Sequence, residues 1–304
     1  GCCIEAVPAD VVGGVTANVF VEPDGTARLQ SVQQQISSPQ YTCAGVVHPQ
    51  TSAPFEAIRD AAMSIAGAAF RKKITGYISV DFVVFRRPDN RALRMWAVDV
   101  ELRITNCALA HSLAMLTTGA QYDHETGHCI VRTRQQQLGA SSAGGAGDVS
   151  VASVTTTSEV GETTRPLCYA YSGVLHHPFI SALRHAAFFS LCKQRGLSFD
   201  VHTRTGVVYH LVDVLLCNCL GFLCIAGSFH QCAGMLLDSV DFLQQQLNAA
   251  NASHTEGACN VNALLTAARN MAQKAAVERR RQIGQQQQQQ QQHASQSFAS
   301  TTRR

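Results

Sequence analysis

The sequence is poor in charge: only 15% of its 304 residues are Asp, Glu, Lys or Arg, and its formal net charge is +3. With so small a charge, and with basic residues scattered until the C-terminus, no nucleic-acid partner is expected. Long uninterrupted apolar runs are also missing. The most apolar stretch, residues 211–227, is interrupted by Asp213 and Asn218. It is shorter than the roughly 20 apolar residues of a membrane helix, so we predict a buried hairpin and no membrane partner.

A framework spacing of cysteines is absent, although the chain contains 12 of them. Most lie inside apolar runs, and the group Cys217, Cys219 and Cys224 has no C-x-x-C pair, which favours strand packing over a zinc site. With no secretory signal in the sequence, we predict reduced, mostly buried thiols and a cytoplasmic protein. The chain begins GCCIEAVP, without an initiator Met, which predicts a piece of a longer protein.

Apolar residues are plentiful, at 46%, and the chain is long enough to bury a sizeable core. Its composition predicts four zones: a first packed zone at 1–132, a Gly/Ser/Thr-rich flexible linker or insertion at 133–166, a second packed zone at 167–249, and a tail at 250–304. In the tail we expect a helix over 261–283. The eight consecutive glutamines at 285–292 are predicted to be disordered, because polar repeats cannot bury a core.

Turn signals and periodicity place the main elements. Pro23-Asp24-Gly25 predicts a tight turn between two strands within 18–36. Residues 55–73 are typical of an amphipathic helix that begins after Pro54. Its predicted buried stripe is Phe55, Ile58, Ala62, Ile65 and Ala69. Farther along we predict a helix over 178–195 ended by Gly196, strands near 198–202, 206–215 and 220–227, and a helix over 230–247.

The segment WAVDVELRIT, residues 96–105, has an unusual charge pattern for a strand. Alternation predicts one apolar core face, made of Trp96, Val98, Val100, Leu102 and Ile104. The opposite face would carry Asp99, Glu101 and Arg103. Antiparallel pairing with residues 76–85, around a turn centred on Asn90, would place Asp81 directly opposite Asp99 and diagonal to Glu101.

Three carboxylates so close together would repel one another strongly. At an effective dielectric of about 20, each ionised pair costs roughly 2–3 kcal/mol, and the trio costs on the order of 8 kcal/mol. Protonation, a basic neighbour or a bound cation could offset this cost, and Arg103 supplies one positive charge against three negative ones. Oxygen ligands of this kind suit Mg²⁺. The other interpretation is a different strand register, in which the acids are simply solvated.

These residues also resemble a known family. SVDFVVF (79–85) followed by WAVDVELRI (96–104) closely resembles the end of an ATP-grasp catalytic core, in which acids on two strands hold Mg²⁺ against nucleotide phosphates. CIEAVP resembles the hinge strand over adenine, and FVEPDGTARLQSVQQQIS resembles a hairpin of the peptide-ligase branch of that superfamily. GLSFDVHTRTGVVYHLVD and LGFLCIAG resemble its small C-terminal domain. The resemblance implies an α+β fold: the C-terminal part of an ATP-grasp fold, with an antiparallel sheet and packed helices, plus a small α+β domain.

The resemblance also implies roles for individual residues. Asp81 and Asp99 match the acids that hold Mg²⁺, and Glu101 stands where the family usually has Asn, as a third metal ligand of different charge. Arg103 would contact phosphate or the acyl-phosphate intermediate, with a salt bridge to Glu101 as the alternative. The His of the ligase branch is not matched, since His111 lies two positions later on a presumed helix, where packing is expected.

Two further residues are implied to bind ATP: Glu5 resembles the hinge acid, and Gln35 resembles a site glutamine. The phosphate-binding lysines and glycine-rich loop of the family would precede Gly1, so the resemblance implies that this chain carries only part of a site.

The activity implied is Mg·ATP-dependent ligation of a carboxylate to an amine through an acyl phosphate, with both substrates unknown. The alternative is a scaffold that has lost catalysis and binds protein partners in a cilium or flagellum, because DVELRIT is most similar to ATP-grasp-like regions of proteins from those organelles. A calmodulin-type partner is a weaker expectation for a helix at 263–283. Its apolar stripe would be Leu264, Leu265, Ala268 and Met271, ahead of Arg279–Arg281.

Overall fold

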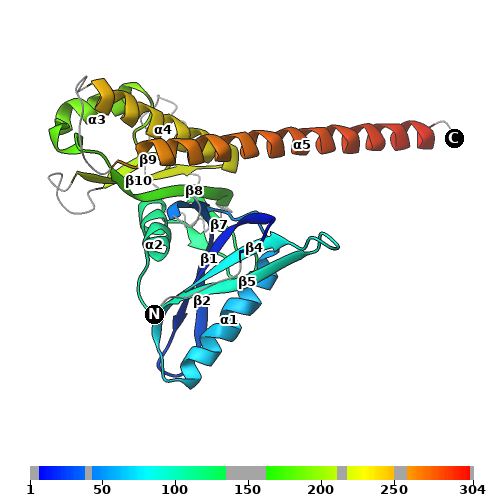
Figure 1. Cartoon of the computed structure of the whole chain (residues 1–304). Helices are drawn as coiled ribbons and strands as arrows, with labels where there is room; N and C mark the ends of the chain where they lie inside the picture. Colours follow the sequence, from blue (N-terminus) through cyan, green and yellow to red (C-terminus); the bar gives the residue numbers. More distant parts are fainter. Residues whose placement is uncertain (1–6, 38–42, 135–161, 211–217, 250–258, 302–304) are drawn as a thin grey trace, which may run out of the picture.

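The computed structural model describes residues 7–37, 43–134, 162–210, 218–249 and 259–301 (Figure 1). Its strands are β1 (Val11–Val21), β2 (Ala27–Ser37), β3 (Cys43–His48), β4 (Gly76–Arg86), β5 (Leu93–Glu101), β6 (Gln121–Tyr122), β7 (Cys129–Arg134), β8 (Glu162–His176), β9 (Gly206–His210) and β10 (Cys219–Ala226). Its helices are α1 (Phe55–Arg71), α2 (Asn106–Thr118), the 3₁₀ turn η1 (Ile180–Ala182), α3 (His185–Gln194), α4 (Phe229–Ala249) and α5 (Val261–Thr301).

The described strands form one ten-stranded sheet, in the order β5-β4-β1-β2-β3-β8-β10-β9, with β7 also paired to β8 and β6 to β7. All of these pairs are antiparallel. The predicted α+β class, an antiparallel sheet with packed helices, is therefore confirmed. We call β1–β5 with α1 the N-terminal half and β8–β10 with α3–α5 the C-terminal half. The two halves meet where β3 pairs with β8.

The first hairpin and helix form as the sequence predicts. Between β1 and β2 the chain turns over Gly25, which has a φ of 92° and donates its N–H to the Glu22 carbonyl at 3.0 Å. A residue with a side chain would be strained in this conformation. Helix α1 begins after Pro54 and buries Ile58 and Ala62 against β1, β2 and β4. Ala66, rather than the expected Ile65, continues the buried stripe.

The acidic hairpin β4–β5 has the predicted register at its acidic end, where Asp81 pairs with Asp99. Beyond this pair the register shifts, and Phe82 pairs with Ala97, which leaves Val98 as the extra residue of a β-bulge. The bulge reverses the alternation of facing, so Trp96, opposite Val83, lies on the same sheet face as the acids.

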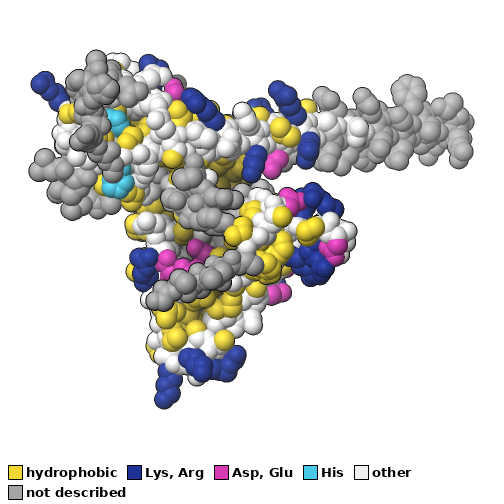
Figure 2. All heavy atoms as spheres, viewed as in Figure 1, with side chains coloured by type: hydrophobic (Ala, Val, Ile, Leu, Met, Phe, Trp, Pro, Cys, Tyr) yellow, Lys and Arg dark blue, Asp and Glu magenta, His cyan; other side chains and the backbone are white. Residues whose placement is uncertain are grey.

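The predicted core face of this segment is therefore wrong. Its members are exposed by 44% (Trp96), 45% (Val98), 43% (Val100), 55% (Leu102) and 61% (Ile104). They are uncovered because β5 is the edge strand of the sheet, whereas α1 packs over β1 and β2. Figure 2 shows apolar side chains on the surface of the N-terminal half.

The C-terminal half encloses its central strand completely. Every residue of β10 is buried, because β8 and β9 flank it, α4 and α5 cover one face, and α2 contributes to the other. The predicted hairpin partner, residues 211–217, lies outside the described residues.

Two local predictions in the C-terminal half are wrong. The expected helix over 178–195 is helical only in α3, preceded by η1, because the His177 side chain accepts the Phe179 N–H in a local turn. The helix does end as predicted, before Gly196 with a φ of 70°. The expected strand at 198–202 is a turn instead, since Asp200 Oδ1 accepts the N–H groups of His202 and Thr203.

The predicted linker at 133–166 is shorter than expected. Its first residues belong to β7 and its last to β8, and these two strands pair from Cys129–Leu167 to Arg134–Glu162. Residues 135–161 lie outside the described residues. The division of the chain into domains at 132 and 166 stays a prediction.

Helix α5 contradicts two expectations for the tail. It runs through the glutamines at 285–292 instead of ending before a disordered segment, since glutamine is a good helix former and the buried beginning of α5 nucleates the helix. The stripe that would meet a calmodulin-type partner is already used, because Leu264 is 1% exposed and Met271 is 8% exposed within the core shared with α4. Among the described helices, none has the length and apolarity needed to cross a membrane.

Candidate functional site

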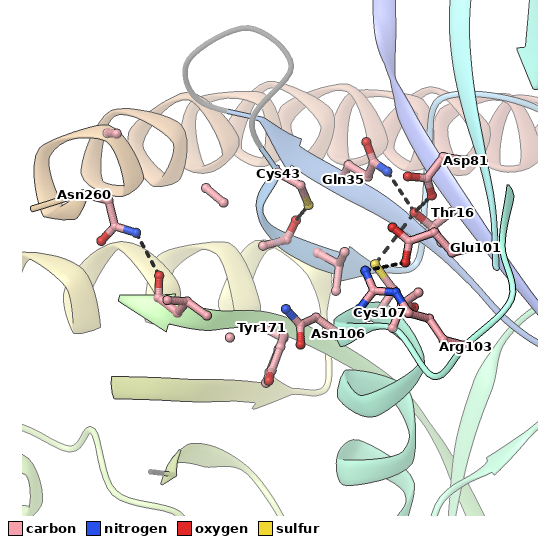
Figure 3. Close-up of a pocket in the computed structure, with 17 residues that line it drawn as sticks. Thr16, Gln35, Cys43, Asp81, Glu101, Arg103, Asn106, Cys107, Tyr171 and Asn260 are labelled. Carbon is pink, nitrogen blue, oxygen red and sulfur yellow. Dashed lines mark hydrogen bonds and ion pairs between the residues drawn. The ribbon is translucent and has the colours of Figure 1, made fainter. Parts of the chain in front are cut away.

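A polar cavity of about 310 Å³ lies beside the acidic hairpin, between the two halves (Figure 3). The structure brings four of the predicted site residues into its lining: Gln35, Asp81, Glu101 and Arg103. Seven other lining residues with polar side chains were not predicted, namely Thr16, Cys43, Thr105, Asn106, Cys107, Tyr171 and Asn260. Acidic side chains gather beside the hollow between the two halves in the space-filling view (Figure 2).

Asp81 is the final acceptor of a short hydrogen-bond chain. Thr16 Oγ1 donates to Asp81 Oδ1 at 2.6 Å, and Gln35 Nε2 donates to Thr16 Oγ1 at 2.9 Å. Burial raises the pKa of Asp81 above its ordinary value, and the negative charges of Glu101 and Asp99 raise it further, whereas the bonds from Thr16 and Gln35 act in the opposite direction. The carboxylate repulsion expected from the sequence is therefore present in the folded hairpin.

Glu101 and Arg103 form an ion pair at the rim of the cavity. Arg103 Nη2 lies 2.8 Å from Glu101 Oε2, and the side chain of Arg103 is 71% exposed. This is the salt bridge that the sequence left open as the alternative to a phosphate contact. The ion pair places the positive charge of Arg103 beside Glu101, where an anionic ligand in the cavity would meet it.

Asp99 occupies a different environment from the other two acids. It is exposed, its Oδ1 accepts the N–H of Val100 at 2.8 Å, and it does not line the cavity. Its assignment as a metal ligand stays a prediction.

The donor set at the cavity fits a magnesium ion that arrives with a phosphate ligand. No group of three His, Cys, Asp or Glu side chains is arranged to hold a metal in the described parts of the chain. Asp81 and Glu101 nevertheless bring two carboxylates to one cavity. Mg²⁺ typically takes one or two carboxylates and completes its shell with water and substrate phosphates.

A buried polar network adjoins the cavity through Thr105, a lining residue whose Oγ1 lies 2.9 Å from Ser79 Oγ. Asn18 Nδ2 donates to Ser31 Oγ at 3.0 Å and to Gln33 Oε1 at 2.9 Å, and Ser79 Oγ donates to Asn18 Oδ1 at 2.6 Å. All four residues are buried. The only sign of this network in the sequence is that Thr16 and Asn18 alternate with apolar residues along β1. From that alternation alone, the face that carries these polar side chains would be expected to face solvent.

A histidine–tyrosine cluster lies beneath this network at the seam between the halves. His111, which the sequence predicts to pack rather than react, is 8% exposed, and its Nδ1 lies 3.2 Å from the Tyr169 hydroxyl. His48 stacks on the Tyr169 ring with centroids 5.1 Å apart. Burial lowers the pKa of both His48 and His111 to about 4, so both imidazoles are neutral near pH 7.

The remaining predicted ligand cannot be placed. Glu5, the implied hinge acid, lies outside the described residues. Tyr171 and Asn260 could not have been assigned to the site from the sequence, since they reach the cavity only through the pairing of β3 with β8 and the packing of α5.

Comparisons with known proteins match the first part of the chain to a protein family. Residues 1–125 match a protein-family model described as IQCH-like, ATP-grasp. The resemblance to the ATP-grasp superfamily is confirmed. A curated relative, IQ motif-containing protein H of Danio rerio, is 26% identical to this chain over 268 residues. That match covers 87% of this chain but 22% of the relative, so the ATP-grasp-like chain spans about a fifth of that protein. The narrower assignment to the peptide-ligase branch stays a prediction.

Solved structures that resemble this ATP-grasp-like chain include carboxylases and a synthetase. One is the biotin carboxylase domain of Hydrogenobacter thermophilus 2-oxoglutarate carboxylase, in complex with MgADP, ADP and bicarbonate, with a TM-score of 0.46, 8% identity, and coverage of 86% of this chain and 50% of that one. Another is N5-carboxyaminoimidazole ribonucleotide synthetase from Thermus thermophilus, with a TM-score of 0.44, 10% identity, and coverage of 82% of this chain and 54% of that one.

Proposed function

We propose that the cavity binds a Mg²⁺–nucleotide, with Asp81 and Glu101 as the carboxylates that hold the metal. The observation that carries this proposal is the convergence of both acids, from neighbouring strands, on one cavity. Burial raises the pKa of Asp81 most, the negative charges of Glu101 and Asp99 raise it further, and a divalent cation would offset both costs of the ionised carboxylate. Asp99, opposite Asp81 and two residues before Glu101 on β5, would add negative charge from just outside the cavity.

In the whole protein we assign this site to carboxylate–amine ligation with ATP. Mg²⁺, when bound, neutralises charge on the phosphoryl group that passes to the carboxylate. The chain's own residues do the rest: Thr16 and Gln35 hold the Asp81 carboxylate in place, and Arg103, on a side chain that can leave Glu101, contacts the phosphate or acyl phosphate. The acid and amine substrates are not identified by these residues.

A second candidate function is a scaffold that retains the fold without catalysis. The ion pair between Glu101 and Arg103 favours it, because it neutralises internally the two residues that would otherwise meet metal and phosphate. In that case the protein would act through protein partners, and we propose a cilium or flagellum as the place where it does so.

Titration calorimetry with ATP, with and without Mg²⁺, tests the first proposal on the chain and on the full-length protein. Asp81→Asn should weaken Mg²⁺-dependent binding by about 10- to 100-fold, as loss of a metal contact does. The matched control is Asp89→Asn at the exposed tip of the same hairpin, where Asp89 pairs with Arg87, and it should leave binding unchanged. Equal binding by wild type and Asp81→Asn would reject the metal assignment.

Glu101→Asn separates the two functions. It restores the side chain usual in the family and frees Arg103 from its ion pair. A ligase site should keep or improve Mg²⁺-dependent nucleotide binding in this variant. If the full-length wild-type protein binds no nucleotide and Glu101→Asn does, the scaffold function is supported.

A further inference from the structure

We propose that Cys219 and His176 form a nucleophilic thiol–imidazole pair, a site for modification by hydrogen peroxide and other small electrophiles. The two residues lie directly opposite each other, at the start of β10 and the end of β8. Cys219 Sγ is 2.9 Å from His176 Nδ1 and 3.6 Å from Nε2, so the sulfur lies against the imidazole ring, and a rotation of the ring brings a nitrogen into line for proton transfer. Neither residue lines the cavity that holds the acids.

The backbone on the histidine side of the pair is fixed by Asn260. The N–H of His176 donates to Asn260 Oδ1 at 2.7 Å, and the carbonyl of His176 accepts the N–H of Asn260 at 3.2 Å. Asn260 Nδ2 also donates to the Val174 carbonyl at 2.8 Å. These bonds tie the end of β8 to the start of α5, so the imidazole projects from a rigid strand.

The cysteine side is fixed in a similar way. Asn218, with a φ of 56°, accepts the N–H of His177 at its carbonyl at 3.1 Å and the N–H of Ser181 at its Oδ1 at 3.3 Å. Cys219 follows directly and enters the sheet opposite His176. A nucleophile and base held on fixed backbones need little reorganisation before reaction.

Cys219 differs from the other described cysteines in its partner. Burial raises the pKa of the Cys168 thiol to about 11 and of the Cys224 thiol to about 12, and neither contacts an imidazole. Cys43 and Cys259 are exposed, but in the described parts of the chain no histidine contacts them. Thiols without a basic neighbour react slowly, whereas a thiol beside an imidazole is a better nucleophile.

The reaction with peroxide balances within this pair. The thiol proton passes from Cys219 Sγ to the His176 imidazole, and the thiolate attacks one oxygen of hydrogen peroxide. The S–O bond forms as the O–O bond breaks, and the departing hydroxide takes the proton from the imidazolium as water. Sulfur is oxidised to a sulfenic acid and peroxide is reduced. Cys219 is only 8% exposed, so hydrogen peroxide, the smallest of these reagents, is the one used to probe it.

The test compares cysteines within one molecule. The folded chain is treated with substoichiometric hydrogen peroxide and is then unfolded in excess dimedone, which traps sulfenic acid, and each cysteine is quantified by peptide mass spectrometry. Cys219 should react at least about tenfold faster than the exposed Cys43 and Cys259. Faster reaction of the two exposed cysteines overturns the proposal, and this outcome requires no variant to fold.

A substitution identifies the role of the imidazole. His176→Gln should slow modification of Cys219 about tenfold while Cys259 reacts as before. His177→Gln, which changes the adjacent imidazole, is the control and should leave the rate at Cys219 unchanged. Continued protection of the buried Cys224 shows that a variant is folded. An unchanged rate at Cys219 in folded His176→Gln would overturn the proposal.

Discussion

Strands β5 and β10 have similar lengths and both are mostly apolar, although β5 also carries three charged residues, and they have opposite environments. All eight residues of β10 are buried, whereas the side chains of Trp96, Val98 and Val100 in β5 are more than 40% exposed. The difference lies in their neighbours. Strand β10 has a strand on each side and helices on its faces, and β5 has one strand neighbour and lies beyond the reach of α1.

This comparison explains where the candidate site is. An enclosed strand such as β10 leaves no room for a ligand and contributes stability. An edge strand keeps its side chains accessible, so β5 can present Glu101 to a cavity at little cost to the core. The N-terminal half thus carries the polar chemistry of the nucleotide proposal, while the C-terminal half closes the far wall with Tyr171 and Asn260.

The largest expected effect is on stability and contrasts two aromatic residues. Phe222→Ala in β10 should lower the free energy of unfolding by about 3–5 kcal/mol, since the ring is fully buried and its removal leaves a cavity. Trp96→Ala in β5 should cost only about 1 kcal/mol, because the ring is 44% exposed and mainly contacts Phe85. Urea denaturation measures both, and equal losses would contradict the assigned environments.

The second prediction concerns acid sensitivity at the seam between the halves. The pKa values of His48 and His111 are about 4 in the folded protein, below the ordinary 6.5, so the unfolded chain binds more protons between these values. Stability is therefore complete above pH 6.5 and decreases as the pH falls toward 4. Each histidine should contribute a loss of about 3 kcal/mol by pH 4, from about 1.4 kcal/mol per pKa unit.

Denaturation curves at pH 7.5, 6 and 5 test this dependence. His48→Gln should flatten it, and His202→Gln, at an exposed site, should leave it unchanged. If His48→Gln retains the full dependence on pH, the buried imidazole at the seam is not its source.

The smallest expected effect is the change in the free energy of unfolding when one of the hairpin acids is replaced in the absence of metal. The raised pKa of Asp81 means that its folded form binds a proton more readily than the unfolded chain, so this group lowers stability as the pH rises through its folded value. Asp81→Asn should therefore raise the free energy of unfolding at pH 7 by about 0.5 kcal/mol, as expected for relief of a like-charge pair. The exposed Asp99→Asn should have a smaller effect, and Mg·ATP should stabilise wild type more than Asp81→Asn.

Much of the local structure could be predicted from the sequence, because its determinants are local. Pro23-Asp24-Gly25 required a turn, Pro54 marked the start of α1, and the pairing of Asp81 with Asp99 followed from one hairpin turn. The bulge at Val98 could not be predicted, since nothing in the strand's alternation signals an extra residue. The helix through the glutamines was missed because composition alone does not reveal what nucleates it.

By itself, the sequence determined which acids meet across the hairpin and which superfamily the chain resembles, because both depend on residues close together in the chain. The tertiary structure alone decided that β5 is an edge, that Tyr171 and Asn260 close the cavity, and that Cys219 lies against His176. These facts depend on strand order and on contacts between residues far apart in sequence. No periodicity encodes them, because burial is a property of the neighbours that a strand acquires when the whole chain folds.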